Sequence, residues 1–229
     1  MRCLFVVLLL ASVLALGAGT YYSRGNLPID ETSSWRSNRD GSGSSPSGFL
    51  LTAHNFIVQD GDSMDAEGTW TLHYNSTVLI ETGGKITSGS YNHDIFLSLQ
   101  AGATYEVTHF TYGSLEIGTL DPASTFIFNK NAGLSIYDDI TFGNVTVRAG
   151  SVGVAGTNGL TLNGNLKVET GAIFSGGTNS SLTNSIGSIE IDGGTFYGSS
   201  GSAGITYNIA GDVVINSGTF YSTYLTGTE

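Results

Sequence analysis

One pattern of apolar and polar positions recurs along most of the chain. It reads apolar, any residue, apolar, two turn residues, glycine, two further residues and a last apolar one, as in "VLIETGGKI" and "LKVETGAIF". Eight copies begin at Phe56, Val78, Leu97, Phe126, Val145, Leu166, Ile189 and Val213. Because residues two positions apart face the same side of a strand, each copy predicts a short strand, a tight turn and a second strand.

The sixth position of the pattern is a glycine in seven of the eight copies. These glycines are Gly61, Gly83, Gly102, Gly150, Gly171, Gly194 and Gly218, and the copy from Phe126 has Asn131 instead. Glycine adopts a positive φ without steric cost, and asparagine tolerates it better than most residues. We therefore expect a left-handed backbone at this turn in every copy.

The spacing of the copies predicts how they assemble. Their starts follow one another at 22, 19, 29, 19, 21, 23 and 24 residues. One coil of this length cannot bury its apolar side alone, whereas stacked coils form a continuous core with parallel strands. The pattern predicts an all-β protein, a right-handed parallel β-helix (β-solenoid) of about eight coils of roughly 19–24 residues, with the hand taken from the usual chirality of parallel connections. A β-sandwich is the alternative, but the fixed glycine position favours the solenoid.

Two segments precede the repeats. Residues 1–19, "MRCLFVVLLLASVLALGAG", combine Arg2, an apolar run and small residues, which predicts a secretory signal peptide. Residues 20–49 are polar without apolar periodicity and predict an irregular leader or cap, with Trp35, Tyr21 and Tyr22 packing onto the first repeat. Residues 50–229 form the solenoid repeats, which we expect to be truncated at the C-terminus.

Composition and charge narrow the class of protein. Of 229 residues, 33 are glycine and 12% are charged, so the chain is neither a disordered polyelectrolyte nor a low-complexity tail. The net charge of −11 disfavours nucleic acid and anionic membranes as partners. The one cysteine lies in the predicted signal peptide, so no disulfide is expected. We expect a secreted protein, extracellular or on a bacterial outer surface, with no membrane span after signal cleavage.

Several stretches resemble a known kind of protein. They are "TYYSRGN" from Thr20, "HNFIVQDGDSM" from His54, "GNVTVRAG" from Gly143 and "LNGNLKVETGAIF" from Leu162. Together they resemble the repetitive β-solenoid surface proteins, adhesin-like, that the bacterial type IX secretion system exports. The resemblance implies a solenoid, export across the outer membrane and an adhesive or stalk-like role, with no shared catalytic residues. Such proteins end in a sorting domain, whereas this chain stops at Glu229, so we expect a fragment.

Histidines and aspartates are the candidate ligands for a metal ion. The four histidines, spaced by 19, 20 and 16 residues, are His54, His73, His93 and His109. They lack further ligands at zinc-like spacing, so solvated or turn histidines are favoured. The aspartates that hint at calcium are Asp60, Asp62, Asp65, Asp138 and Asp139. Neither an EF-hand loop nor a calcium-roll nonapeptide surrounds them, so structural turns are favoured and no cofactor is predicted, with calcium kept as the alternative.

The sequence gives little support for a catalytic function. Hydrolysis of a glycan needs paired carboxylates, and Glu169 and Glu190 on adjacent coils are the only candidates that stacking suggests. None of the strong bases after residue 19 lies beside an acidic cluster in the sequence; they are Arg24, Arg36, Arg39, Lys85, Lys130, Arg148 and Lys167. The prediction is a protein that is not an enzyme. The alternative is the N-terminal part of a carbohydrate-active β-helix, lyase-like or hydrolase-like.

The aromatic residues give the sharpest binding hypothesis. Phe196-Tyr197 and Phe220-Tyr221 are adjacent pairs, so one member of each pair should face the core and the other the solvent. Exposed flat rings with Asn and Thr nearby are typical of sugar-binding surfaces. The candidate glycan-binding residues are Tyr197, Tyr207, Tyr221 and Tyr224; a core aromatic stack is the favoured alternative. We expect a non-catalytic extracellular structural or adhesive module whose partners are an extracellular glycan, a cell surface, or further copies through the solenoid ends.

Overall fold

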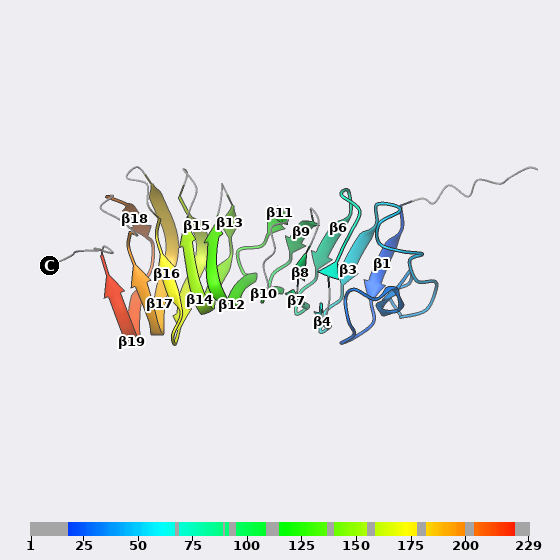
Figure 1. Cartoon of the computed structure of the whole chain (residues 1–229), viewed down its shortest axis with the longest axis horizontal. Coiled ribbons are helices and arrows are strands. Elements are labelled where there is room, and N and C mark those ends of the chain that lie inside the picture. The colour runs from blue at the N-terminus through cyan, green and yellow to red at the C-terminus, as the bar shows by residue number, and fades with distance from the viewer. Residues whose placement is uncertain are drawn as a thin grey trace, which may run out of the picture.

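The computed structural model describes residues 18–66, 69–88, 90–91, 95–108, 115–136, 140–154, 159–177, 182–199 and 204–222. These residues form an elongated parallel β-solenoid whose strands follow the chain from β1 at one end to β19 at the other (Figure 1). The only helical element in these ranges is one turn of 3-10 helix, η1 (Thr32–Ser34). Nothing in the described chain is a helix long and apolar enough to span a membrane.

The first sheet stacks one strand from each early coil. In spatial order it contains β11 (Leu115–Leu120), β9 (Ile95–Leu99), β6 (Thr77–Ile80), β3 (Asn55–Val58), β1 (Thr20–Ser23) and β2 (Trp35–Arg36). All pairs are parallel except β1 with β2, which is antiparallel. Phe56, Val78 and Leu97 occupy equivalent positions and are buried, so the strands pair with their apolar sides in register.

The second sheet runs the whole length of the rod. Its successive rungs are β4 (Ser63–Asp65), β7 (Lys85–Ser88), β10 (Thr104–Val107), β12 (Thr125–Ile136), β14 (Asn144–Val154), β15 (Thr161–Glu169), β17 (Thr183–Tyr197) and β19 (Val213–Tyr221). The shorter strands β13 (Thr141–Phe142), β16 (Ile173–Ser175) and β18 (Thr206–Ile209) extend these rungs around the coil. A separate pair joins β5 (Thr69–Trp70) and β8 (Ser90–Tyr91).

The predicted solenoid is confirmed, with a smaller number of turns. The solenoid has about six turns rather than about eight equivalent coils.

The 29-residue spacing between two copies is not an insertion. The copies from Phe56, Val78 and Leu97 lie in the first sheet, but Phe126 pairs with Tyr105 and Val145 in the second. From Phe126 onward, the first strand of each copy therefore lies in the second sheet, on a different side of the coil. Equivalent residues of the second sheet keep a spacing of 19 to 24 residues; they are Ile86, Tyr105, Phe126, Val145, Leu166, Ile189 and Val213.

The turn glycines confirm most of the predicted backbone and correct one position. The sixth-position glycines other than Gly194 have φ between 73° and 94°. In the copy from Ile189 the prediction is wrong, because Gly193 (φ 87°) takes the left-handed conformation instead. Glu169 lies opposite both Asp192 and Gly193, so the register between β15 and β17 shifts at this turn. Asn131 lies within β12, and its side chain is outside the described residues.

The leader is more regular than the sequence predicted. Thr20–Ser23 forms β1, which pairs in parallel with β3 and so begins the stack. Trp35 is fully buried, its ring lies 5.9 Å from that of Trp70 and nearly parallel to it, and its Nε1 donates to the carbonyl of Ile29 at 2.9 Å. This packing agrees with the predicted role of Trp35. The N-terminal end of the core is therefore covered by aromatic side chains.

Candidate ligand-binding surface

Tyr197 and Tyr221 form a stacked pair on the outside of the last coils. They are in register across β17 and β19, with ring centroids 5.1 Å apart and ring planes 9° from parallel. Their neighbours Phe196 and Phe220 stack on the inner side at 4.8 Å, and Phe196 stacks on Phe174 of β16 at 5.4 Å. The predicted alternation is confirmed, and the structure shows that phenylalanine is the inner member of each pair and tyrosine the outer one.

This stacking limits how a sugar could use the tyrosine pair. The rings repeat along the axis of the rod, so their flat faces point toward one another and their edges and hydroxyls toward solvent. Tyr221, 47% exposed, is on the last rung, and among the described strands none follows it. A sugar that packs on a ring face would therefore reach only the outer face of Tyr221.

Tyr207 has a different environment from the other candidates. Its ring lies 5.7 Å from that of Phe196, edge to face, and its hydroxyl donates to the carbonyl of Gly198 at 2.6 Å. Burial raises the pKa of Tyr207 to about 12, although a hydrogen bond with Asn184 opposes the rise. The ring of Tyr207 therefore packs against the edge of the core. Tyr224 lies outside the described residues.

Tyr207 also borders a groove that the sequence analysis missed. The groove, of about 570 Å³, crosses β15, β17 and β18. Thr161, Ser185 and Asn208 line it from equivalent positions on successive rungs, and Asn163 lies beside them. Its volume is within the range of small-molecule sites in proteins. The signal was the recurrence of a hydroxyl or amide at 23- to 24-residue spacing, which becomes visible only once the coil register is known.

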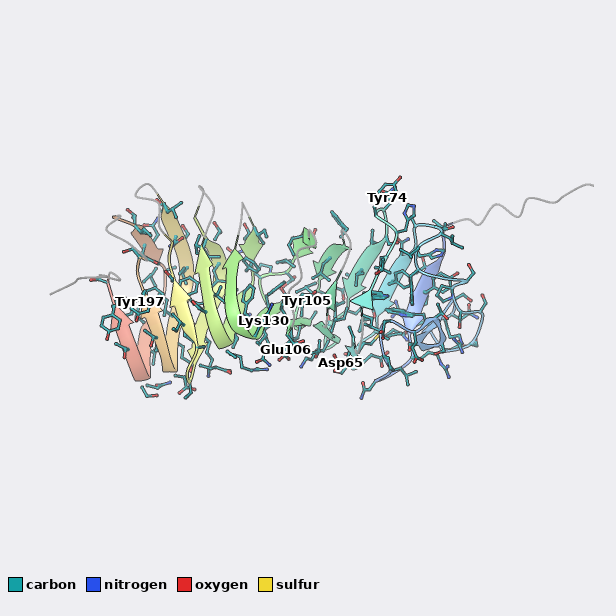
Figure 2. All side chains as sticks on the ribbon, in the orientation of Figure 1. Asp65, Tyr74, Tyr105, Glu106, Lys130 and Tyr197 are labelled. Atoms are coloured by element: carbon teal, nitrogen blue, oxygen red, sulfur yellow. The ribbon has the colours of Figure 1, made fainter. Side chains whose placement is uncertain are left out.

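A column of ion pairs follows the outer side of the second sheet. Glu106, whose side chain is 5% exposed, accepts hydrogen bonds from Lys85 Nζ (2.6 Å), Asn129 Nδ2 (2.6 Å) and Arg148 Nη1 (3.1 Å). Burial alone would raise the pKa of Glu106, but hydrogen bonds from Lys85 and Asn129 and the two positive charges lower it overall. Figure 2 shows Glu106 near the middle of the rod. The carboxylate thus joins rungs on both sides of β10.

The column continues toward the C-terminus and corrects the sequence analysis. Arg148 Nε also contacts Glu169 at 3.1 Å, and Lys167 Nζ contacts Glu190 at 3.0 Å and Asp192 at 3.3 Å. No strong base lies beside an acidic cluster in the sequence, but stacking places residues 21 to 25 positions apart side by side and so gives these bases acidic neighbours in the fold.

The two carboxylates suggested as a catalytic pair are not opposite each other. Lys167 is in register with Glu190, whereas Glu169 is opposite Asp192 and Gly193. Each of the two glutamates instead contacts a cation of a neighbouring rung. Both carboxylates therefore link adjacent coils.

The described histidines have structural contacts. His54 is buried, its Nδ1 accepts a hydrogen bond from the Gly19 amide at 3.1 Å, and burial, with a smaller effect of His73, lowers its pKa. The His73 ring stacks on that of Tyr74 at 4.4 Å, and Tyr74 projects from the upper edge of the rod in Figure 2. His93 and His109 lie outside the described residues.

Asp62, an acidic residue near the first turn, also has a structural contact. Asp62 accepts hydrogen bonds from the Ser23 hydroxyl and from the Gly25 amide, the latter at 3.0 Å. It therefore ties the leader to the first coil. In the part of the chain that the structure describes, no group of three or more His, Cys, Asp and Glu residues could hold a metal ion. Asp138 and Asp139 are outside that part.

Comparison with known proteins does not add a relative. No protein-family model, curated protein or solved structure matches this chain. Its function must therefore be inferred from the surface itself, that is, from the groove, the tyrosine pair and the ion-pair column.

Proposed function

We propose that the chain is a non-catalytic structural and adhesive module of a secreted or cell-surface protein, and that it binds an extracellular glycan through the outer surface of its last coils. The observation that carries the proposal is the groove across β15, β17 and β18, with equivalent polar side chains on successive rungs.

The spacing of these polar groups suits a polymeric ligand. Thr161, Ser185 and Asn208 recur at the distance between hydrogen-bonded strands, about 4.8 Å. A polysaccharide also repeats its hydroxyl groups along one direction, so a chain lying along the rod would meet a similar donor or acceptor at each coil. Hydroxyl and amide side chains can both donate to and accept from sugar hydroxyls.

The structural part of the proposal rests on the stack. The inner columns are continuous, and Glu106, Arg148 and Lys167 link rungs on the outside. Such a rod holds its surface groups in a fixed row, as an adhesive or spacer module requires. Secretion, and the resemblance to proteins of the type IX system, rest on residues 1–19 and the stretches compared above.

Affinity electrophoresis tests the glycan proposal. The full chain is run through gels that contain single polysaccharides from a panel, with and without calcium, and each polysaccharide is then checked for shortening. We expect one polysaccharide to retard the chain without being shortened. Ser185→Ala/Asn208→Ala should weaken retardation about tenfold or more, because two hydrogen-bonding groups leave the groove.

The matched control is Thr195→Ala/Thr219→Ala, which removes outward hydroxyls from the side of the coil that bears the tyrosine pair. Equal weakening by both double variants would contradict binding in the groove. Retardation with depolymerisation would contradict the non-catalytic assignment. Absence of retardation by every polysaccharide would refute glycan binding and leave a spacer role alone.

A further inference from the structure

The charged residues of the last coils are confined to a small part of each coil. The stretches 149–166, 170–189 and 193–211 contain no Asp, Glu, Lys, Arg or His. Most of each of these coils therefore carries no charge, although the chain as a whole has a net charge of −11. The charged residues that bound the three stretches are Arg148, Lys167, Glu169, Glu190, Asp192 and Asp212.

The register of the strands gathers these charges into the ion-pair column. Lys167 and Glu190 occupy equivalent positions on β15 and β17, and Glu169 lies opposite Asp192. Arg148 and Lys167 are the only strong bases after residue 130 of the sequence, and each contacts two carboxylates. Their positive charges are therefore already compensated within the protein.

A corner of the coil separates the ion-pair column from the groove. Gly164 and Gly187 lie between the groove residues and the ion-paired residues on β15 and β17, and the alternation of buried and exposed side chains changes phase there. A Cβ atom on Gly164 or Gly187 would lie 2.3 or 2.4 Å from an oxygen atom of the preceding rung, so only glycine allows this close stacking. The groove and the column therefore belong to different sides of the coil.

The uncharged region coincides with the groove. Thr141 of β13 occupies the position equivalent to Thr161, but Asp138 and Asp139 closely precede it in the sequence. The three uncharged stretches begin after this rung, and they contain all the residues that line the groove. The absence of charge is thus a property of the groove side of the last coils and not of the whole rod.

We propose that the groove binds a neutral polysaccharide and excludes acidic ones. This inference rests on the glycan binding proposed above and names the class of glycan. The hydroxyl groups of Thr161 and Ser185 and the amide of Asn208 can both donate to and accept from sugar hydroxyls. A uronate, sulfate or phosphate group would lose hydration in the groove without gaining a positive partner, and it would meet the net negative charge of the chain.

Binding of the full chain to immobilised polysaccharides, measured by biolayer interferometry, tests the inference. The neutral set is a β-glucan, a mannan, a xylan and a galactan, and the acidic set is polygalacturonate, alginate and hyaluronate. We expect binding to at least one neutral polysaccharide and to none of the acidic ones. This binding should change by less than about twofold between about 0.05 and 0.5 M salt, because no ion pair with the ligand is available to be screened.

Two matched asparagine variants locate the binding and test its dependence on charge. Asn208→Lys places a positive charge in the groove and should weaken binding of the neutral polysaccharide about tenfold or more, because the amide hydrogen bonds are lost. It should also introduce salt-sensitive binding of an acidic polysaccharide. Asn216→Lys is the control, since the Asn216 amide lies 3.4 Å from the Glu190 carboxylate in the ion-pair column, and it should leave neutral binding unchanged. Circular dichroism checks that both variants keep the β-sheet spectrum.

The outcomes separate this inference from the proposed function. Binding of acidic polysaccharides alone, lost at high salt, would overturn the neutral class while leaving glycan binding in place. Equal weakening by Asn208→Lys and Asn216→Lys would place the neutral polysaccharide outside the groove and would also overturn the inference. Absence of binding to every polysaccharide would refute the inference and the glycan proposal together.

Discussion

The two ends of the solenoid complete the same core in different ways. At the N-terminal end, Trp35 is fully buried and contacts Phe56 edge to face at 4.9 Å, and β2 covers β1. At the C-terminal end, Phe220 stacks on Phe196 and remains 40% exposed. In a repeat protein each coil is stabilised mainly by its neighbours, so a rung with one neighbour contributes less than a rung with two.

The two ends also differ in their charged side chains. Arg39 forms two hydrogen bonds with Glu81, of 2.6 and 2.7 Å, and lies 4.7 Å from the centre of the Tyr22 ring. These contacts tie the leader to the β6 coil. β19 has no charged side chain with which to do the same. The comparison indicates that a charged side chain of the leader stabilises the N-terminal end, whereas β19 contributes none.

The largest expected effect is the loss of stability when the buried tryptophan at the N-terminal end is replaced. Trp35→Ala leaves a large cavity under the leader and is expected to reduce the free energy of unfolding by about 3–5 kcal/mol. Phe220→Ala should reduce it by only about 1–2 kcal/mol, since much of that ring is already in water. Urea unfolding followed by circular dichroism measures both. Similar losses for the two variants would show that the ends are equally stabilised.

The local pattern was enough to predict the fold class. Alternating apolar residues and a glycine at fixed spacing indicated strands, left-handed turns and stacking, and the structure confirms them at Gly61, Gly83 and Gly150. The pattern could not tell one side of the coil from another, since both sides have the same alternation. For this reason the 29-residue spacing between Leu97 and Phe126 did not indicate the change of sheet.

The residues of the candidate site could not be predicted without knowing which residues of neighbouring coils lie opposite each other. The contact of Lys85 with Glu106 and the alignment of Thr161 with Ser185 join neighbouring coils, and they follow only when the length of every coil is known. The tyrosine pair was easier to predict because Tyr197 and Tyr221 occupy the same place in two nearly identical stretches. Sequence similarity between coils therefore revealed like-on-like contacts and missed contacts between unlike residues.

The Glu106 cluster tests whether the two ends are energetically coupled. Glu106→Gln removes the charge that Lys85 and Arg148 share, and should reduce the free energy of unfolding by about 1–3 kcal/mol at neutral pH. Because the pKa of folded Glu106 is lowered from 4.5, its stabilisation is present above that pH and is lost as the pH falls through the folded value. The difference between wild type and variant should therefore shrink on acidification.

Unfolding curves at neutral and acidic pH measure this effect. Glu190→Gln is the control, since Glu190 contacts Lys167 in a more exposed pair, and its effect should be smaller. A loss that is as large at acidic pH as at neutral pH would mean that the Glu106 charge does not stabilise the fold. Two unfolding transitions in Glu106→Gln, where wild type has one, would show that this cluster couples the two halves of the rod.

The smallest expected effect concerns the phenol at the edge of the C-terminal core. Tyr207→Phe removes the hydrogen bond to the Gly198 carbonyl and should reduce the free energy of unfolding by about 1 kcal/mol at neutral pH. Burial raises the pKa of Tyr207 from 10.0 to about 12, so the unfolded chain loses this proton first, and the stabilisation falls as the pH rises between those values. The advantage of wild type over Tyr207→Phe should thus fall through this interval and change sign, because two pKa units correspond to about 2.7 kcal/mol, more than the hydrogen bond contributes. Tyr221→Phe, at an exposed ring, should match wild type at neutral pH within a few tenths of a kcal/mol. If the difference for Tyr207→Phe stays constant up to pH 12, the phenol is not shielded, and the C-terminal coil is more open than its contacts with Phe196 indicate.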